Sequence, residues 1–147
     1  MMRNNILLTL LFLFLTYGTT YGFCFYQAGA TYQISPELLS AIARVESGLD
    51  PSAMNQNTNG SYDVGLMQIN SIWKKSLGGR WRHLSDPCYN VMVGSWILRQ
   101  CMNRYGYSWD GVACYHTGKG LSDSGREKQK LAEKYINRVQ TVLAKNP

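Results

Sequence analysis

The segment from Ser35 to Gly48 constrains the fold of this chain most strongly, because it carries the start, the periodicity and the end of an amphipathic helix. Ser35 offers a capping hydroxyl, Pro36 suits the first helical position and Glu37 is an acid in the first turn. The apolar positions, which recur at helical spacing, are Leu38, Leu39, Ala41, Ile42 and Val45. We therefore predict a helix that runs to about Ser47 and stops at Gly48.

Glu46 is the unusual residue of this helix. At 100° per residue it falls between Leu39 and Ile42, on the side that faces the core. Loss of water around a carboxylate disfavours its charged form, so the pKa of Glu46 should be raised. A carboxylic acid that stays protonated near neutral pH can protonate the leaving oxygen of a glycosidic bond. The alternative is an ordinary glutamate at a helix end that extends into water or pairs with an arginine.

Similar start signals occur further along the chain. Asp86-Pro87 predicts a helix that ends near Tyr105, and Ser108 caps a shorter one over WDGVACYH. Other helices are expected over 24–32, 71–77 and 125–145. The sum is a mainly α domain.

One polar segment interrupts the helical pattern. Residues 50–62 are rich in Asn and Ser and contain a turn signal at Asn59-Gly60, so we expect a loop or a small β-ribbon. The helix expected over 71–77 follows soon after, and Gly78 and Gly79 should break it.

Basic residues gather on the last expected helix, and the whole chain carries a formal net charge of +6. Such a charge favours an anionic glycan polymer, a membrane surface or nucleic acid as surroundings, although it can equally serve solubility alone. The chain does not interleave basic and aromatic residues as a nucleic-acid platform does, so no nucleic acid is expected. The apolar stripe of this helix is expected to be Leu131, Tyr135, Val139 and Val142 or Leu143.

Residues 1–22 have the layout of a secretory signal peptide. Arg3 lies in a short basic start, residues 6–17 are apolar but too short to span a bilayer comfortably, and small residues follow up to Gly22. We place the cleavage after Gly22, which leaves residues 23–147 as one domain without stable membrane insertion. A retained membrane anchor is the alternative.

The chain has four cysteines, and none forms the close pairs of a zinc site. An even number in an exported chain suggests two disulfides, for which three pairings are possible. We favour Cys24–Cys88, which would tie the mature N-terminus to the domain body, and Cys101–Cys114, which would join neighbouring helices. Free buried thiols that act as small apolar groups are the alternative.

The motif GLMQIN, residues 65–70, contains candidate ligand contacts. Gly65 permits a close approach of the backbone, and the amides of Gln68 and Asn70 can each donate to and accept from sugar hydroxyl and acetamido groups. Leu66 and Ile69 should pack inward, whereas Met67 offers an adaptable apolar contact. Taken alone, the motif could be only a corner between a strand and a helix.

A second motif, CYHTG over residues 114–118, places Tyr115 near a helix end. Its hydroxyl could hydrogen-bond a carboxyl group or a substrate carbonyl, or the ring could be half buried with the hydroxyl at the surface.

The order of these elements resembles that of the lytic transglycosylases, the peptidoglycan-cleaving enzymes of the lysozyme-like superfamily. The matching features are a helix that ends in Glu46-Ser47, then GLMQIN, and then the YxxG turn at Tyr115 after two more helices. The resemblance extends from about Cys24 to Tyr135 and is greatest to the small, single-domain members associated with secretion systems, pili and conjugation. It implies an α+β lysozyme-like fold with the β-ribbon or irregular segment beside the active-site cleft.

By this resemblance, Glu46 is the sole catalytic acid and base. It would cleave the bond between N-acetylmuramic acid and N-acetylglucosamine and form 1,6-anhydromuramic acid, with assistance from the muramoyl N-acetyl group. Tyr115 would orient Glu46 or the acetamido group. Ser47 and Gln68 also match family positions around the acid and the sugars. Three more residues match the family motif that shapes the cleft: Gly65, Leu66 and Met67.

The resemblance also implies a setting. It indicates a periplasmic monomer that acts on peptidoglycan glycan strands, with a secretion-system or pilus component as a further partner. It implies no metal and no organic cofactor.

Two residues depart from the family pattern. His116 stands where asparagine is common, and we expect it to be an exposed turn residue. Asp63 stands where many relatives carry a small residue. If its carboxylate lies about 5 Å from that of Glu46, as in retaining glycosidases, Asp63 could stabilise the oxocarbenium-like state or act as nucleophile. It would then also raise the pKa of Glu46, whereas the alternative is a turn aspartate that caps local backbone amides.

Three functions are therefore compared. The first is a lytic transglycosylase that opens the cell wall locally, for example during assembly of a secretion system or pilus. The second is a hydrolytic lysozyme-type muramidase that uses Glu46 and Asp63. The third is a non-catalytic glycan-binding subunit, against which the presence of both Glu46 and GLMQIN argues.

Overall fold

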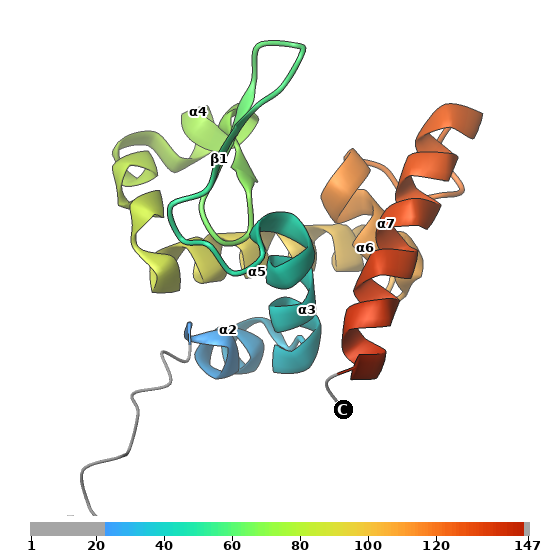
Figure 1. The fold of residues 1–147 in the computed structure, drawn as a ribbon, viewed down its shortest axis with the longest axis horizontal. Coiled ribbons are helices and arrows are strands. Elements are labelled where there is room, and N and C mark those ends of the chain that lie inside the picture. The colour runs from blue at the N-terminus through green and yellow to red at the C-terminus, as the bar shows by residue number, and fades with distance from the viewer. Residues whose placement is uncertain (1–22, 146–147) are drawn as a thin grey trace, which may run out of the picture.

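The computed structural model of the chain describes residues 23–145, so the predicted signal peptide, residues 1–22, lies outside the described part. Figure 1 shows the arrangement of the helices and the sheet. The main helices are α2 (Phe25–Tyr32), α3 (Pro36–Ser47), α5 (Pro87–Tyr105), α6 (Trp109–Thr117) and α7 (Arg126–Lys145). None of the described helices is long and apolar enough to cross a membrane.

Side-chain caps fix the starts of three of these helices, as the sequence signals predict. Ser35 Oγ accepts from the backbone N–H of Leu38 at 3.1 Å, and Asp86 Oδ1 accepts from that of Tyr89 at 2.6 Å. Ser108 caps α6 in the same way. Helix α3 ends at Gly48, whose φ of 69° is easily reached by glycine.

The polar segment after α3 forms the predicted β-ribbon. Strands β1 (Met54–Gln56), β2 (Tyr62–Val64) and β3 (Ile69–Asn70) make an antiparallel sheet in the order β1-β2-β3. Asp63, on the central strand, lies opposite Asn55 on one side and Asn70 on the other. This small sheet beside a helical body confirms the predicted mainly α, lysozyme-like architecture.

The region after the sheet differs in part from the prediction. It contains η2 (Ser71–Trp73), α4 (Lys74–Leu77) and η3 (Gly78–Ser85). The α-helix does end before Gly78, but the two glycines do not end the helical turns, because a 3₁₀ segment continues to Ser85. Tighter 3₁₀ turns are commonly used as short connectors between helices, which is their place here, directly before α5.

Helix α3 lies at the centre of the molecule, in contact with α2 and with α7 (Figure 1). Its residues Leu39, Ile42 and Ala43 are fully buried. Burial of apolar side chains around one central helix supplies most of the free energy that holds this domain folded. The last turn of that helix, which carries Glu46, is therefore fixed by the best-packed part of the domain.

The apolar stripe predicted for α7 is partly wrong. Tyr135 and Val139 are buried, but Leu131 is 57% exposed. Ala132 and Ile136 are buried instead, where they pack with Ala113 of α6. The physical reason is that α7 contacts two helices, α3 and α6, so its buried face is wider and turned away from Leu131.

Both favoured disulfides are present. Cys24–Cys88 joins the start of the described chain to α5, and Cys101–Cys114 joins α5 to α6. The hypothesis of free buried thiols is therefore wrong.

Candidate active site

A groove with a volume of about 840 Å³ is lined by residues from the sheet, from α5 and α6, and from the end of α3. In Figure 1 the sheet stands on one side of the end of α3, and α6 and α7 stand on the other. The predicted site residues that line this groove are Glu46, Asp63, Gln68, Asn70 and Tyr115. Side chains that are far apart in the sequence thus meet in one place.

Glu46 lies in the last turn of α3, and its side chain is largely but not fully buried. The pKa of Glu46 is raised from 4.5 to about 7, mainly by burial and in smaller part by the nearby charge of Asp63. A hydrogen bond from Tyr135 and the charge of Arg138 act in the opposite direction. The net result is a carboxylic acid that is substantially protonated near neutral pH, as its place on the apolar face predicts.

Tyr135 is the direct partner of Glu46. Its hydroxyl donates to Glu46 Oε1 at 2.6 Å, and the residue is only 2% exposed. Burial raises the pKa of Tyr135 well above its ordinary value, and the charge of Glu46 adds to this, so the phenol keeps its proton and remains a donor. The sequence pattern placed Tyr135 only in an apolar stripe and missed this contact. The signal that could have found it is general: a buried tyrosine hydroxyl usually has a polar hydrogen-bond partner.

Two further residues complete the surroundings of Glu46. The ring of His116 stacks on that of Tyr135, with centroids 4.2 Å apart and planes 3° from parallel. Partial desolvation lowers the pKa of His116, with Arg138 contributing, so the imidazole is neutral at neutral pH. Arg138 donates from Nη2 to the backbone oxygen of Val45 at 2.9 Å, which braces α7 against the end of α3. His116 is exposed, as expected, but it lies in the last turn of α6 rather than in a loop turn, and it packs on Tyr135.

Asp63 projects from the central strand rather than from a turn. Its Oδ1 accepts from Asn70 Nδ2 at 2.7 Å and its Oδ2 accepts from Asn57 Nδ2 at 2.9 Å. These donors are side-chain amides, so the interpretation of Asp63 as a cap of backbone amides is wrong. Asp63 and Glu46 line the same groove, and the charge of Asp63 contributes to the raised pKa of Glu46.

Tyr115 does not hydrogen-bond Glu46. Its hydroxyl donates to the backbone oxygen of Met67 at 2.6 Å. Because the single hydroxyl proton is used there, the role of orienting Glu46 falls to Tyr135 and not to Tyr115. Tyr115 instead joins α6 to the GLMQIN segment while its ring lines the groove.

The apolar part of GLMQIN shapes the groove from behind. Leu66 and Met67 are fully buried, so Met67 does not offer the predicted apolar contact with a ligand. The backbone N–H of Met67 donates to Asn90 Oδ1 at 2.8 Å. Gly65 has a φ of 77°, and a side chain there would collide with Asn90, which explains the need for glycine.

The polar part of GLMQIN faces the groove. Gln68 Nε2 donates to the backbone oxygen of Gly65 at 2.8 Å, and Gln68 Oε1 accepts from Asn55 Nδ2 at 2.6 Å. Asn70 Oδ1 caps η2 by accepting from the backbone N–H of Ile72. These amides are therefore held in place by the sheet before any ligand arrives.

Ser47 does not line the groove. Its hydroxyl donates to the backbone oxygen of Leu66 at 2.9 Å and accepts from the backbone N–H of Asp50. Ser47 thus joins the end of α3 to the GLMQIN segment.

Across residues 23–145 there is also no group of three or more His, Cys, Asp or Glu side chains that could hold a metal ion.

Comparison with known proteins agrees with this geometry. The sequence model of the family described as "Transglycosylase SLT domain" matches residues 23–137. Invasion protein IagB of Salmonella typhimurium (strain SL1344) is 41% identical over 128 residues, which cover 82% of this chain and 80% of the relative. Protein IpgF of Shigella flexneri is 36% identical over 127 residues, with 84% and 83% covered.

A third relative, from Escherichia coli O157:H7, bears the name peptidoglycan-binding-like protein and is 34% identical over 124 residues, with 77% of this chain and 74% of the relative covered. The family match covers every residue that lines the groove of Glu46, and it also includes Tyr135. The chain therefore belongs to the transglycosylase SLT family, the lytic transglycosylases of the lysozyme-like superfamily.

Proposed function

We propose that this protein is an exported lytic transglycosylase. It cleaves the β-1,4 bond between N-acetylmuramic acid and N-acetylglucosamine in peptidoglycan and leaves a 1,6-anhydromuramoyl end. The observation that carries the proposal is Glu46, a carboxyl group with a pKa of about 7 in a groove lined by amide side chains. Membership of the transglycosylase SLT family supports the same chemistry.

The chemistry needs one group that gives a proton and takes it back. Protonated Glu46 donates its proton to the glycosidic oxygen as the bond to the anomeric carbon breaks. The muramoyl N-acetyl oxygen stabilises that carbon, and the amide oxygens of Gln68 and Asn70, which line the groove, would accept hydrogen bonds from sugar hydroxyl groups. Ionised Glu46 then removes the proton from the muramoyl 6-hydroxyl, whose oxygen closes onto the anomeric carbon. No water is consumed, and Tyr135 keeps the carboxyl group oriented throughout.

The setting proposed for this enzyme is the periplasm, where it acts as a monomer after removal of residues 1–22. A domain of this size suits local opening of the wall, for instance during assembly of a secretion system or pilus. The name of the Salmonella relative, an invasion protein, is in keeping with such a role. A component of that machinery would then be its protein partner.

One specific observation favours a second candidate, a hydrolytic muramidase. Asp63 lies in the groove with Glu46, and two amides hold its carboxylate in a fixed orientation. Such an ionised partner could stabilise the oxocarbenium-like state while water attacks, as in enzymes with two carboxylates.

Mass spectrometry of the products separates the two candidates. Purified peptidoglycan is digested with the mature protein, and the muropeptides are weighed. The transglycosylase yields anhydromuramoyl ends, which lack one water relative to the reducing ends left by hydrolysis. Glu46→Gln serves as the control, because it preserves shape but has no proton to give. Persistent digestion by that variant would remove Glu46 from the reaction, and products that are mainly reducing would reject the transglycosylase in favour of the muramidase.

A further inference from the structure

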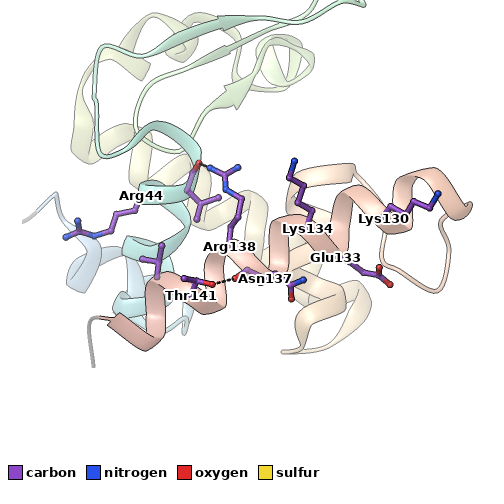
Figure 2. A pocket seen from close by; sticks show the side chains of 9 residues that line it. Arg44, Lys130, Glu133, Lys134, Asn137, Arg138 and Thr141 are labelled. Atoms are coloured by element: carbon purple, nitrogen blue, oxygen red, sulfur yellow. Dashed lines mark hydrogen bonds between the residues drawn. The ribbon is translucent and has the colours of Figure 1, made fainter.

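A second groove, with a volume of about 700 Å³, lies between α3 and α7 (Figure 2). None of its lining residues lines the groove of Glu46. Its charge is strongly positive, because its lining contains a single acid, Glu133, and four cations. The cations are Arg44, Lys130, Lys134 and Arg138.

The cations differ in how far the protein already uses them. Lys130 lies 3.3 Å from Glu127, and Arg138 donates to the backbone oxygen of Val45. Arg44 and Lys134 are exposed, and neither forms a salt bridge within residues 23–145. Two cations are thus available to an anionic ligand, and Arg138 is held at the wall of the groove.

The basic groove lies near Glu46, since the charge of Arg138, which lines this groove, acts on the Glu46 carboxyl group. Val45 lines it, and the next residue is Glu46. On the facing helix Lys134 precedes Tyr135, whose hydroxyl binds Glu46. Figure 2 shows that Lys134 and Arg138 extend from α7 toward the side on which α3 ends.

We propose that this basic groove binds the carboxylates of the peptide stem on the muramoyl residue whose bond is cleaved. The inference rests on the proposed function and refines its substrate, from a bare glycan strand to a strand that carries peptides. The bond that Glu46 protonates belongs to a muramoyl residue, and the lactyl group of that same sugar carries the stem. The stem must therefore leave the sugar close to Glu46, and its free carboxylates make it complementary to a groove with four cations and one acid.

The test compares two substrates prepared from the same peptidoglycan. One keeps its peptide stems, and the other has lost them to an amidase that cuts between the lactyl group and the peptide. The variant R44Q/K134Q removes the two cations without a salt bridge, and both are exposed, so the fold should persist. K128Q is the matched control, since Lys128 is an exposed lysine of α7 that does not line the groove.

The expected result is a change in substrate preference. For the double variant, kcat/KM on stem-bearing strands should fall about tenfold, as the loss of two partly solvated ion pairs implies. On stem-free strands kcat/KM should stay at the wild-type value, and K128Q should match the wild type on both substrates. The melting temperature of each variant reports that the domain is folded.

Two results would overturn the assignment while leaving the proposed function intact. The first is wild-type cleavage of both strands by the double variant, which would leave the cations as a surface for an anionic protein partner. The second is an equal loss on both strands, which would show that the cations act without the stem. If the wild-type protein cleaves neither strand, the proposed function itself fails and the stem site with it.

Discussion

At the scale of single residues, the state of Glu46 depends on opposing neighbours. Burial and Asp63 raise the pKa of its carboxyl group, whereas the Tyr135 hydroxyl and Arg138 lower it, and the balance is about 7. In the proposed reaction the protonated acid is the active form. The alkaline limb of the pH–rate profile should therefore report this pKa, and changes to single neighbours should move the limb in opposite directions.

Tyr135→Phe should move the alkaline limb to higher pH. The variant loses the hydrogen bond that favours ionised Glu46, so the pKa of Glu46 rises. It also loses orientation of the carboxyl group, and the maximal rate should fall about tenfold, the value of one hydrogen bond to a charged group. The measurement is the rate of fragment release from purified peptidoglycan across pH. Tyr115→Phe is the matched control, because that hydroxyl binds Met67, and a limb that shifts equally in both variants would contradict the assignment.

Asp63→Asn should move the same limb to lower pH. The substitution removes the negative charge that helps to raise the pKa of Glu46, so the acid ionises more easily. Asp123→Asn removes a carboxylate that does not line the groove and should leave the limb in place. An unchanged limb for Asp63→Asn would mean that the two carboxylates are not coupled and would remove Asp63 from the site.

Glu46→Gln should stabilise the protein at alkaline pH. Because the folded-state pKa of about 7 lies above the ordinary value of 4.5, the native state binds the proton more tightly, and stability falls as the pH rises from 4.5 to 7. The glutamine variant lacks this loss. At pH 8 its free energy of unfolding should exceed that of the wild type by about 2 kcal/mol, a figure reduced for partial exposure, and the difference should vanish below pH 4. Urea unfolding at both pH values measures it, and an equal difference at both would show that Glu46 is not desolvated.

At the scale of elements, local signals predict what is local. The caps at Ser35 and Asp86 set the starts of α3 and α5 because each acts within one turn. The placement of Glu46 on the apolar face follows from the period of one helix. Its partner Tyr135 lies 89 residues further on, and only the packing of α7 against α3 brings the two together. The same packing decides that Ile136 is buried and Leu131 is not, which the pattern of α7 alone does not predict.

Asn90→Ala should loosen the segment that shapes the groove. Asn90 is fully buried and accepts from the backbone N–H of Met67 while donating to the backbone oxygens of Val64 and Leu84. Loss of its side chain leaves these groups without partners, so the free energy of unfolding should fall by about 2–4 kcal/mol. Activity should fall as well, since Gln68 is held next to Met67. Thermal unfolding measures the first effect, and the exposed Asn103 of the same helix supplies the control, Asn103→Ala. Equal stability of the two variants would contradict a structural role for Asn90.

At the scale of the whole molecule, the two disulfides have different roles, one in stability and one in the shape of the groove. Cys24–Cys88 spans 64 residues and lies away from the groove, whereas Cys101–Cys114 spans 13 residues and both of its cysteines line the groove. A cross-link lowers the conformational entropy of the unfolded chain more when it closes a longer loop. A cross-link beside the groove also fixes the distance between α5 and α6. Tyr115 and His116 both lie on α6.

Replacing each cysteine pair by serine should therefore affect stability and activity in opposite order. Loss of Cys24–Cys88 should lower the free energy of unfolding by about 4 kcal/mol, and loss of Cys101–Cys114 by about 3 kcal/mol. At a temperature where both variants are folded, loss of Cys101–Cys114 should lower activity more than loss of Cys24–Cys88. Of the two bridges, only Cys101–Cys114 links α6, which carries Tyr115 and His116, to α5. Chemical unfolding and peptidoglycan cleavage, measured on the same preparations, check the two halves of the prediction. If the variant without Cys24–Cys88 lost more activity while folded, the shape of the groove would depend on the N-terminus rather than on the contact between α5 and α6.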